Sequence, residues 1–195
     1  MNKPSTFARI RALNARQQIA FNLMLIERML PNYQLFSELS QQGDPKVLKN
    51  ITELLWQWLY TPKFKIDVNL QQQKIEEVIP ATQDSDGIGA FAAVDAAMAL
   101  VSNLALLEES EFKHKEAVYI SIISQGTIER MLIMSGEAEH SKEALENPHM
   151  IWEIDTQNEF LDSVEKIKKF EKHHHKELKS QALADGVTNL GVEIE

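Results

Sequence analysis

Apolar residues recur every three or four positions through most of the chain, which is the period of an α-helix with one buried face. The first such stripe starts at Phe7, Ile10 and Leu13 and continues through Phe21 to Met29. Pro31 lacks a backbone N–H, so we expect it to end this helix. A short helix over residues 34–41 is expected to follow.

Several later helices carry recognisable start or stop signals. Asp44-Pro45 and Asn147-Pro148 each join a capping side chain to a proline at the first helical position, and Asp67 opens another helix. A helix from about Phe112 is expected to end at Gly136. The helix after Pro148 is expected to be long and to end in a solvated surface of alternating Lys and Glu.

The run from residue 87 to residue 107 is the most apolar in the chain. Sixteen of its 21 residues are apolar, seven of them Ala, and its single charge is Asp95. This composition predicts a helix that is buried over most of its circumference. A buried carboxylate is costly unless it is paired or protonated, so Asp95 requires a partner.

No strand pattern and no Pro/Gly/Ser-rich linker interrupts these helices. The sequence therefore predicts one all-α domain over residues 1–195, a bundle of about seven to eight helices with the Ala-rich helix at its centre. Gly186 and Gly191 break the end of the chain. Residues 182–195 are expected to form an irregular or extended tail.

Composition narrows the classes of function. The chain has no Cys, which excludes disulfides, thiolate metal sites and thiol nucleophiles. A net charge of −9 argues against nucleic acid as a partner, because it cannot neutralise phosphates. We expect an acidic cytoplasmic protein with no membrane span and no signal peptide, since Asp95 interrupts the one apolar run of suitable length.

A census of arginines suggests a partner for Asp95. Three of the five Arg lie at or before Arg16, and the other two are Arg28 and Arg130. A guanidinium stays charged and can donate two hydrogen bonds to one carboxylate. We therefore expect a structural polar lock between Asp95 and Arg28, with Arg130 as the second choice. Hydrogen bonds from Tyr, Trp or backbone donors are the alternative.

The residues around Arg28 also carry a family resemblance. The set that carries it comprises Glu27-Arg28-Met29, Pro31-Asn32-Tyr33, Leu55-Trp56, Glu76-Glu77, Ile79-Pro80, Asp84, Asp86, Asp95-Ala96, Ala99-Leu100, Asn147-Pro148 and Asn189-Leu190-Gly191. Together these segments resemble the bacterial domain-of-unknown-function family 416, over essentially the whole chain. The resemblance implies an all-helical bacterial cytosolic protein without an established activity, linked to histidine-kinase signalling only through genomic neighbourhood. It also favours Arg28 over Arg130, because Glu129-Arg130-Met131 is not part of the pattern.

Candidate chemistry is sparse. Asp84, Asp86 and Gly87 hint at a calcium loop, but the required acids are missing at Thr82 and Ala93, so we expect this segment to cap the Ala-rich helix. No Gly-rich phosphate loop or nucleophile elbow is present. The sequence thus assigns no catalytic residue, no cofactor and no metal ligand.

One spacing leaves a metal-binding or enzymatic role open as the alternative. Glu-x-x-His places both side chains on one helix face, as in di-iron bundles. It occurs at Glu111–His114, Glu137–His140, Glu146–His149 and Glu171–His174.

The remaining hypothesis is a non-enzymatic protein–protein interaction or signalling accessory role. Aromatic residues are enriched at interfaces. A partner surface is expected from Tyr33, Trp56, Trp58 and Trp152. The partner is an unidentified protein or a second copy of the chain, which would form a homodimer.

Overall fold

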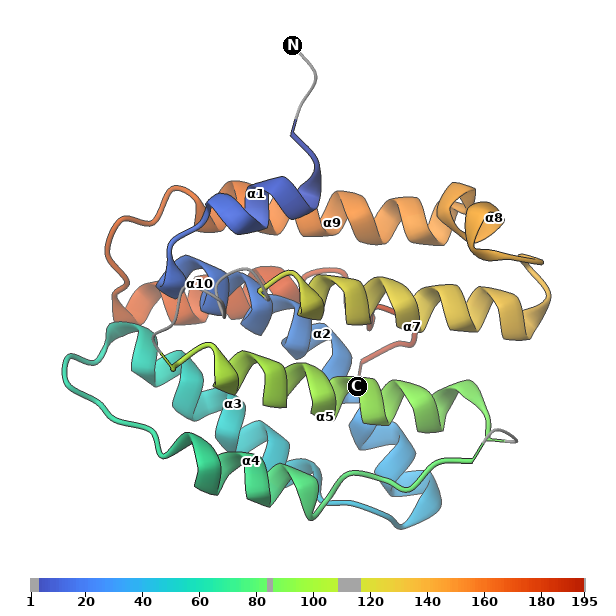
Figure 1. Cartoon of the computed structure of the whole chain (residues 1–195), viewed down its shortest axis with the longest axis horizontal. Helices are drawn as coiled ribbons and strands as arrows, with labels where there is room; N and C mark the ends of the chain where they lie inside the picture. Colours follow the sequence, from blue (N-terminus) through green and yellow to red (C-terminus); the bar gives the residue numbers. More distant parts are fainter. Residues whose placement is uncertain (1–3, 84–85, 109–116, 195) are drawn as a thin grey trace.

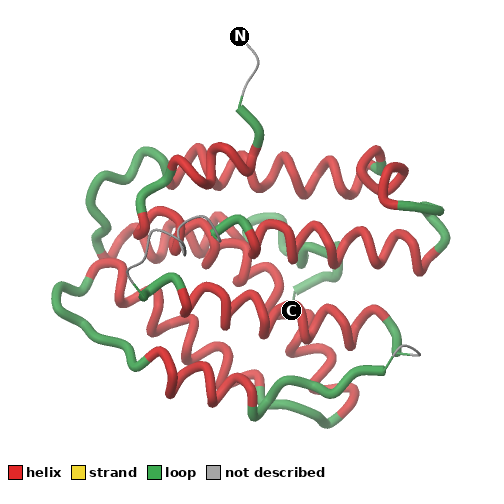
Figure 2. The backbone as a smooth tube through the Cα atoms, in the orientation of Figure 1, coloured by secondary structure: helices red, strands yellow, loops and turns green. Residues whose placement is uncertain are grey.

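The computed structural model describes residues 4–83, 86–108 and 117–194, and these ranges contain helices and loops but no strand (Figure 2). This confirms the predicted all-α class. The nine helices of the described residues are α1 (Thr6–Ala12), α2 (Ala15–Ser40), α3 (Pro45–Tyr60), α4 (Val68–Glu76), α5 (Ile88–Ala105), α7 (Tyr119–Ser135), α8 (Ser141–Glu146), α9 (Pro148–Val164) and α10 (Lys172–Ala182).

Helix α2 is the most enclosed element. Every residue from 18 to 29 is buried, because α3, α5, α7, α9 and α10 all pack around this helix (Figure 1). The Ala-rich helix α5 lies in the interior beside it, with Ala93, Ala96 and Leu100 fully buried. Small Ala side chains let two helix backbones approach closely, so α5 makes the most extensive packing contact with α2.

The expected break at Pro31 is wrong, because α2 continues through Pro31 to Ser40 as one helix of 26 residues. Proline inside a helix costs about 3 kcal/mol, since it removes a hydrogen bond and crowds the preceding turn. Burial of Asn32, Tyr33 and Ser37 beyond the proline offsets that cost.

Some of the predicted helix starts and ends are confirmed, and others are not. Asp44, Asp67 and Asn147 cap α3, α4 and α9 as predicted, and Gly136 ends α7 in the left-handed region with φ of 77°. The expected long last helix is two helices, α9 and α10. The short helix α8, capped by the side chain of His140, has no counterpart in the prediction.

Two predicted features, a helix start near Phe112 and a cap from Asp84 or Ser85, involve residues outside the described ranges. The helix start near Phe112 lies outside the described residues, and α7 begins at Tyr119. Asp84 and Ser85 also lie outside them. Asp86 accepts a hydrogen bond from the backbone of Gln83 instead of capping α5, whose N-cap is Gly87.

After α10 the chain turns back over the bundle. Val187 and Glu193 form an isolated antiparallel bridge, and Thr188 and Asn189 are fully buried between the helices. This segment therefore packs into the body of the protein.

One described helix, α5, is long and apolar enough to cross a membrane by length and composition alone. Half of its 18 residues are buried inside the protein. Helix α5 packs against α2, α3, α4 and α7, and of its nine other residues only Gly89 and Met98 are exposed.

Candidate functional site

Two neighbouring charged residues of α2 are both buried and lead to different clusters. Glu27 is 6% exposed and Arg28 1% exposed. Consecutive side chains point about 100° apart around a helix. Glu27 consequently reaches α3 and α10, whereas Arg28 reaches α9.

Arg28 forms a buried ion pair with Glu153 of α9. Its Nη1 donates to Glu153 Oε2 at 2.5 Å, and both side chains are at most 1% exposed. The other carboxylate oxygen accepts from Ser124 Oγ at 2.7 Å and from Gln157 Nε2 at 2.8 Å. Both oxygens of this buried carboxylate are therefore hydrogen-bonded, as a buried charge requires.

The C-terminal segment closes this cluster through Asn189. Its side chain accepts from Asn32 Nδ2 at 2.8 Å and donates to Ser124 Oγ at 3.2 Å. Its backbone carbonyl lies 2.8 Å from His149 Nε2. Asn189 thereby connects the chain end to α2, α7 and α9.

Glu27 lies in the second cluster. Its Oε1 accepts from Trp56 Nε1 at 2.8 Å and lies 3.1 Å from Lys179 Nζ. Lys179 also pairs with Glu53. His175 contacts Glu53 at 3.4 Å and stacks on Trp56, with ring centroids 5.1 Å apart.

Burial controls the titration of this second cluster. Desolvation raises the pKa of Glu27 above its ordinary 4.5, although Lys179 and the Trp56 hydrogen bond act against it. Desolvation likewise lowers the pKa of His175 below 6.5, against the pull of Glu53. The pKa of Lys179 is lowered by desolvation, but its two carboxylates outweigh this effect and leave it raised.

The pKa values of Glu27 and Lys179 are both raised, which means that the fold favours the charged form of Lys179 but disfavours the charged form of Glu27. Lys179 gains from two anions, whereas Glu27 shares one cation with Glu53. Attraction therefore outweighs desolvation at the ammonium and not at the Glu27 carboxylate.

A groove of about 480 Å³ opens beside Glu27 and Lys179. Residues of α2, the first half of α3, α10 and the C-terminal segment line it. Gly43, next to the groove residue Asp44, has a φ of +78°, and a Cβ there would clash with Tyr33 Oη, which also lines the groove. That hydroxyl donates to Val78 O at 2.7 Å and accepts from Asp44 N at 3.0 Å, which fixes the start of α3.

The predicted lock between Asp95 and Arg28 is wrong. Arg28 is taken by Glu153, and Asp95 lies on the α7 side of α5, where its Oδ2 accepts from Thr127 Oγ1 at 2.7 Å. The pKa of Asp95 is raised, because desolvation outweighs the opposing effects of the Thr127 hydrogen bond and the nearby Arg130 charge. Asp95 is only half-buried, so it needs no complete ion pair.

Two of the four residues predicted to form an aromatic partner surface cannot do so. Trp56 is fully buried and Tyr33 is 1% exposed, so neither can contact a partner. The guanidinium carbon of Arg16 lies 4.4 Å from the ring centroid of Trp58. The guanidinium carbon of Arg28 lies 4.6 Å from the ring centroid of Trp152. The four residues pack with separate charged or polar groups of their own chain.

The described Glu-x-x-His pairs serve as caps or local contacts. His140 caps α8, His149 contacts Asn189, and Glu171 and His174 form a capping box at the start of α10. Glu111–His114 lies outside the described residues. None of the three described pairs projects into the core of the bundle.

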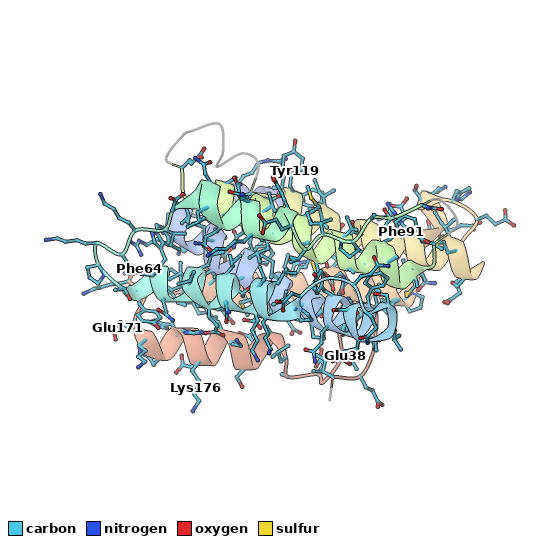
Figure 3. All side chains as sticks on the ribbon, turned by 90° about the horizontal axis from the view of Figure 1, so that it is seen from below. Glu38, Phe64, Phe91, Tyr119, Glu171 and Lys176 are labelled. Atoms are coloured by element: carbon cyan, nitrogen blue, oxygen red, sulfur yellow. The ribbon has the colours of Figure 1, made fainter. Side chains whose placement is uncertain are left out.

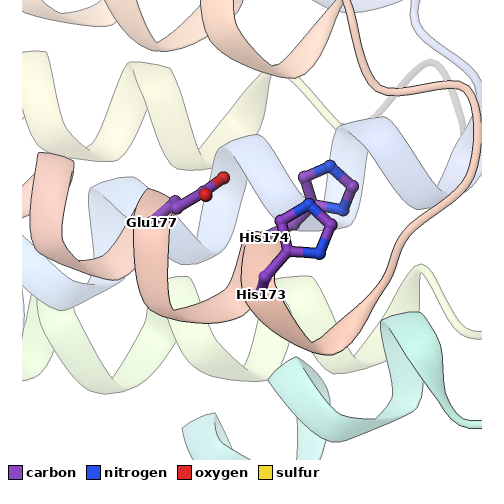
Figure 4. A group of neighbouring side chains, drawn as sticks. All are labelled: His173, His174 and Glu177. Atoms are coloured by element: carbon purple, nitrogen blue, oxygen red, sulfur yellow. The ribbon is translucent and has the colours of Figure 1, made fainter.

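A different trio on α10 has metal-ligand geometry. Ligand atoms of His173, His174 and Glu177 lie within 4.8 Å of one another, and two of the three residues are exposed (Figure 4). Sequence spacing had pointed to Glu171 as the partner of His174. The side chain of His174 instead accepts from the backbone N–H of Glu171.

An apolar outer face runs along α5 and α7. The contacts of Asp95 with Thr127 and of Arg130 with Phe91 set the two helices antiparallel, which brings Met98 level with Ile122. Met98 is 42% exposed and Ile122 43%. We call this surface the α5–α7 face; its exposed apolar residues are Met98, Tyr119, Ile122, Ile133 and Met134.

Comparison with known proteins agrees with this architecture. The model of a protein family of unknown function, DUF416, matches residues 5–193. The crystal structure of a DUF416 family protein from Shewanella baltica has a TM-score of 0.88 at 31% identity, covering 98% of this chain and 100% of that one. The fold is thus that of an all-helical bacterial family.

Two curated relatives extend over nearly the whole chain as well. An uncharacterised protein of Haemophilus influenzae is 32% identical over 95% of both chains, and the uncharacterised protein YjaG of Escherichia coli is 31% identical over 94% of both. The chain belongs to the DUF416 family. The function of its relatives is unknown.

Four of the segments that carried the family resemblance meet in the two clusters around α2, namely those that contain Glu27-Arg28, Asn32, Trp56 and Asn189. Glu27 bonds to Trp56, and Asn32 bonds to Asn189. Sequence reasoning missed Glu153, Lys179 and Glu53. The signal for Glu153 was its position three residues after Met150 and four before Gln157, on the buried stripe of α9.

Removing the acid of the buried ion pair is expected to be strongly destabilising. Glu153→Gln keeps the shape of the side chain but leaves Arg28 without its counter-charge, which should cost about 3–5 kcal/mol in the free energy of unfolding. Urea denaturation measures this loss. Asp162→Asn, at the exposed pair with Arg9, is the matched control and should cost less than about 1 kcal/mol. Similar losses in the two variants would contradict a special role for Glu153.

The raised pKa of Glu27 predicts a pH-dependent stability. Between pH 4.5 and the raised value, the folded state holds more protons than the unfolded state, so wild-type stability falls as the pH rises through this window. Glu27→Gln lacks this loss. The free energy of unfolding of the wild type minus that of the variant should therefore decrease with pH.

Denaturation of both proteins from about pH 4 to pH 8 measures this difference. His175 contributes the opposite slope below pH 6.5, where its protonation favours unfolding, but it does so in both proteins. A difference that increases with pH would show that ionised Glu27 is stabilised by the fold.

Proposed function

We propose that this protein is a non-enzymatic interaction protein that binds through the α5–α7 face, and that the occupant of this face is a second copy of the chain. The observation that carries the proposal is the row of exposed apolar side chains on two adjacent helices. Contiguous exposed apolar surface is typical of interaction sites.

The charge distribution supports a second copy as the partner. Helices α5 and α7 have 18 and 17 residues, yet their only charged residues are Asp95, Glu129 and Arg130. The whole chain carries a net charge of −9, so two copies repel one another over most of their surfaces. The α5–α7 face has the least charge to separate or desolvate when two copies meet.

The shape of α7 also suits a close helix contact. Gly126 lies in the middle of this helix, where Gly costs roughly 1 kcal/mol relative to Ala. Nothing lies within 4 Å of the position that its Cβ would occupy. Gly126, Ile133 and Met134 line a hollow of about 340 Å³ together with the charged Glu129 and Arg130, and a side chain of a two-fold-related copy could fill it.

We expect the wild-type protein to be a dimer and the double variant Met98→Glu, Ile122→Glu to be a monomer. Four buried carboxylates across a two-fold interface would repel and remain unpaired. Light scattering coupled to size-exclusion chromatography measures both masses, and circular dichroism checks that the variant is folded.

Leu39→Glu is the matched control, because Leu39 is a 78% exposed leucine on another part of the surface. Its mass should equal that of the wild type. A wild-type monomer at high concentration, or a dimer that survives the double variant, would refute the proposal. Binding to lipid vesicles instead of dimerisation would assign the face to a membrane.

A second candidate function is metal binding, and the trio of His173, His174 and Glu177 favours it. Imidazole and carboxylate ligands suit Zn²⁺, with an open fourth position for water. We expect untagged wild-type protein to bind one Zn²⁺ in calorimetric titration. His173→Ala should abolish binding, whereas His140→Ala should not change it. No heat above the dilution control, or equal binding by both variants, would exclude this site.

A further inference from the structure

The polar end of the groove beside Glu27 lacks one hydrogen-bond donor. The contacts that Trp56 and Lys179 make with Glu27 both go to Oε1. Among the described residues, no donor reaches Oε2 of this carboxylate, which belongs to a residue only 6% exposed that lines the groove. This oxygen is not one of the enclosed, unpartnered atoms of the described residues, which are Asn22 Oδ1 and Arg28 Nη2, so it is open to the groove and a ligand donor can replace water there.

The charges around Glu27 favour a cationic donor. Three acids and three lysines line the groove. Glu53 lies just beyond the groove and pairs with Lys179, so Lys179 divides one positive charge between two carboxylates. His175 is neutral at pH 7 because burial lowers its pKa. The polar end is therefore left with one net negative charge.

The exposed charged residues at the edge of the groove do not change its preference for a cation. Lys46 and Lys49 stand at the α3 side of the groove, and Glu38 and Asp44 stand near them with the opposite charge. All four are exposed, so water and salt screen them. An anionic ligand would have to compete with Glu27 and Glu53 for Lys179.

The rest of the groove is apolar enough to hold a hydrocarbon chain. Leu30, Pro31, Leu183 and Ile194 form its wall. Its volume of about 480 Å³ is within the range of small-molecule sites.

We propose that this groove binds a small amphipathic amine. Its ammonium group donates to Glu27 Oε2, and its hydrocarbon part lies against Leu30, Pro31, Leu183 and Ile194. An ammonium completes the hydrogen bonding of Glu27 and neutralises the excess charge of the polar end.

This site is separate from the α5–α7 face. Tyr119 of that face and Lys176 of α10 lie on opposite sides of the molecule (Figure 3). Loss of dimerisation would leave amine binding unaffected, and loss of amine binding would leave the dimer intact.

Titration of the wild-type protein with n-hexylamine, n-hexanol and hexanoate tests the proposal. At pH 7 we expect saturable binding of hexylamine, with the alcohol and the carboxylate at least about tenfold weaker, because a charge-assisted hydrogen bond contributes about 1.5–3 kcal/mol. Each further methylene in the amine should strengthen binding up to about fourfold until the groove is filled. Preferred binding of hexanoate would overturn the proposal and assign the site to Lys179.

Substitution of single acids tests whether the amine binds at Glu27. Glu27→Gln should weaken hexylamine binding at least tenfold, whereas the matched change Glu38→Gln on the exposed rim should alter it by less than about twofold. Equal effects would show unspecific attraction by negative charge and would overturn the assignment.

Two measurements keep the proposal falsifiable if Glu27→Gln does not fold. Wild-type binding of hexylamine should weaken as the pH falls and Glu27 takes up a proton, whereas hexanol binding should not change. Leu183→Ser should remove the gain from longer amines. Amine binding that depends on neither pH nor Leu183 would place the amine elsewhere.

Discussion

The buried ion pair between Arg28 and Glu153 fixes how the central helix is rotated. Arg28 can be buried only where a carboxylate meets it, and Glu153 supplies that carboxylate from α9 at 2.5 Å. Because α2 is one rigid helix, orienting Arg28 toward α9 also turns Glu27 toward α3 and α10. The structural pair thus determines where the less satisfied acid lies, and the groove beside Glu27 exists in its present form because Arg28 faces the other way.

The two buried acids show how surroundings set the behaviour of one residue type. Glu153 accepts from Arg28 through Nη1 alone, while Arg28 Nη2 has no partner, and it has two further donors, Ser124 and Gln157. Glu27 has one shared ammonium and one indole donor, and burial raises its pKa. The first acid is held by three donors inside the protein, whereas the second keeps one oxygen that no described donor reaches and that is open to the groove. A site that responds to its surroundings is therefore expected at Glu27 and not at Glu153.

Much of the fold follows from the sequence, because helix signals are local. Asp44, Asp67 and Asn147 act through their own backbone neighbours, and these starts were predicted correctly. Pro31 misled because the helix is held by tertiary burial, which local propensity does not report. The expectation that a buried carboxylate needs a partner was sound in its physics, but assigning Arg28 to Asp95 required knowing which face of α5 is inside. Glu153, Glu53 and Lys179 come from distant helices, so their meeting depends on the packing of the whole bundle.

The composition of α5 explains both this error and the proposed binding face. Six of the seven Ala residues of α5 are buried, and the less buried side carries Phe91, Val94, Met98 and Val101. Both sides are therefore apolar, so periodicity cannot orient the helix. The same Ala residues allow the close contact with α2, which selects the inner face by shape and not by hydrophobicity. Asp95 then falls on the α7 side with Thr127, and Met98 is left exposed on the outside. Helix α5 thus leaves one large apolar side chain exposed, Met98, and the face proposed for dimerisation is built mainly from the exposed apolar residues of α7.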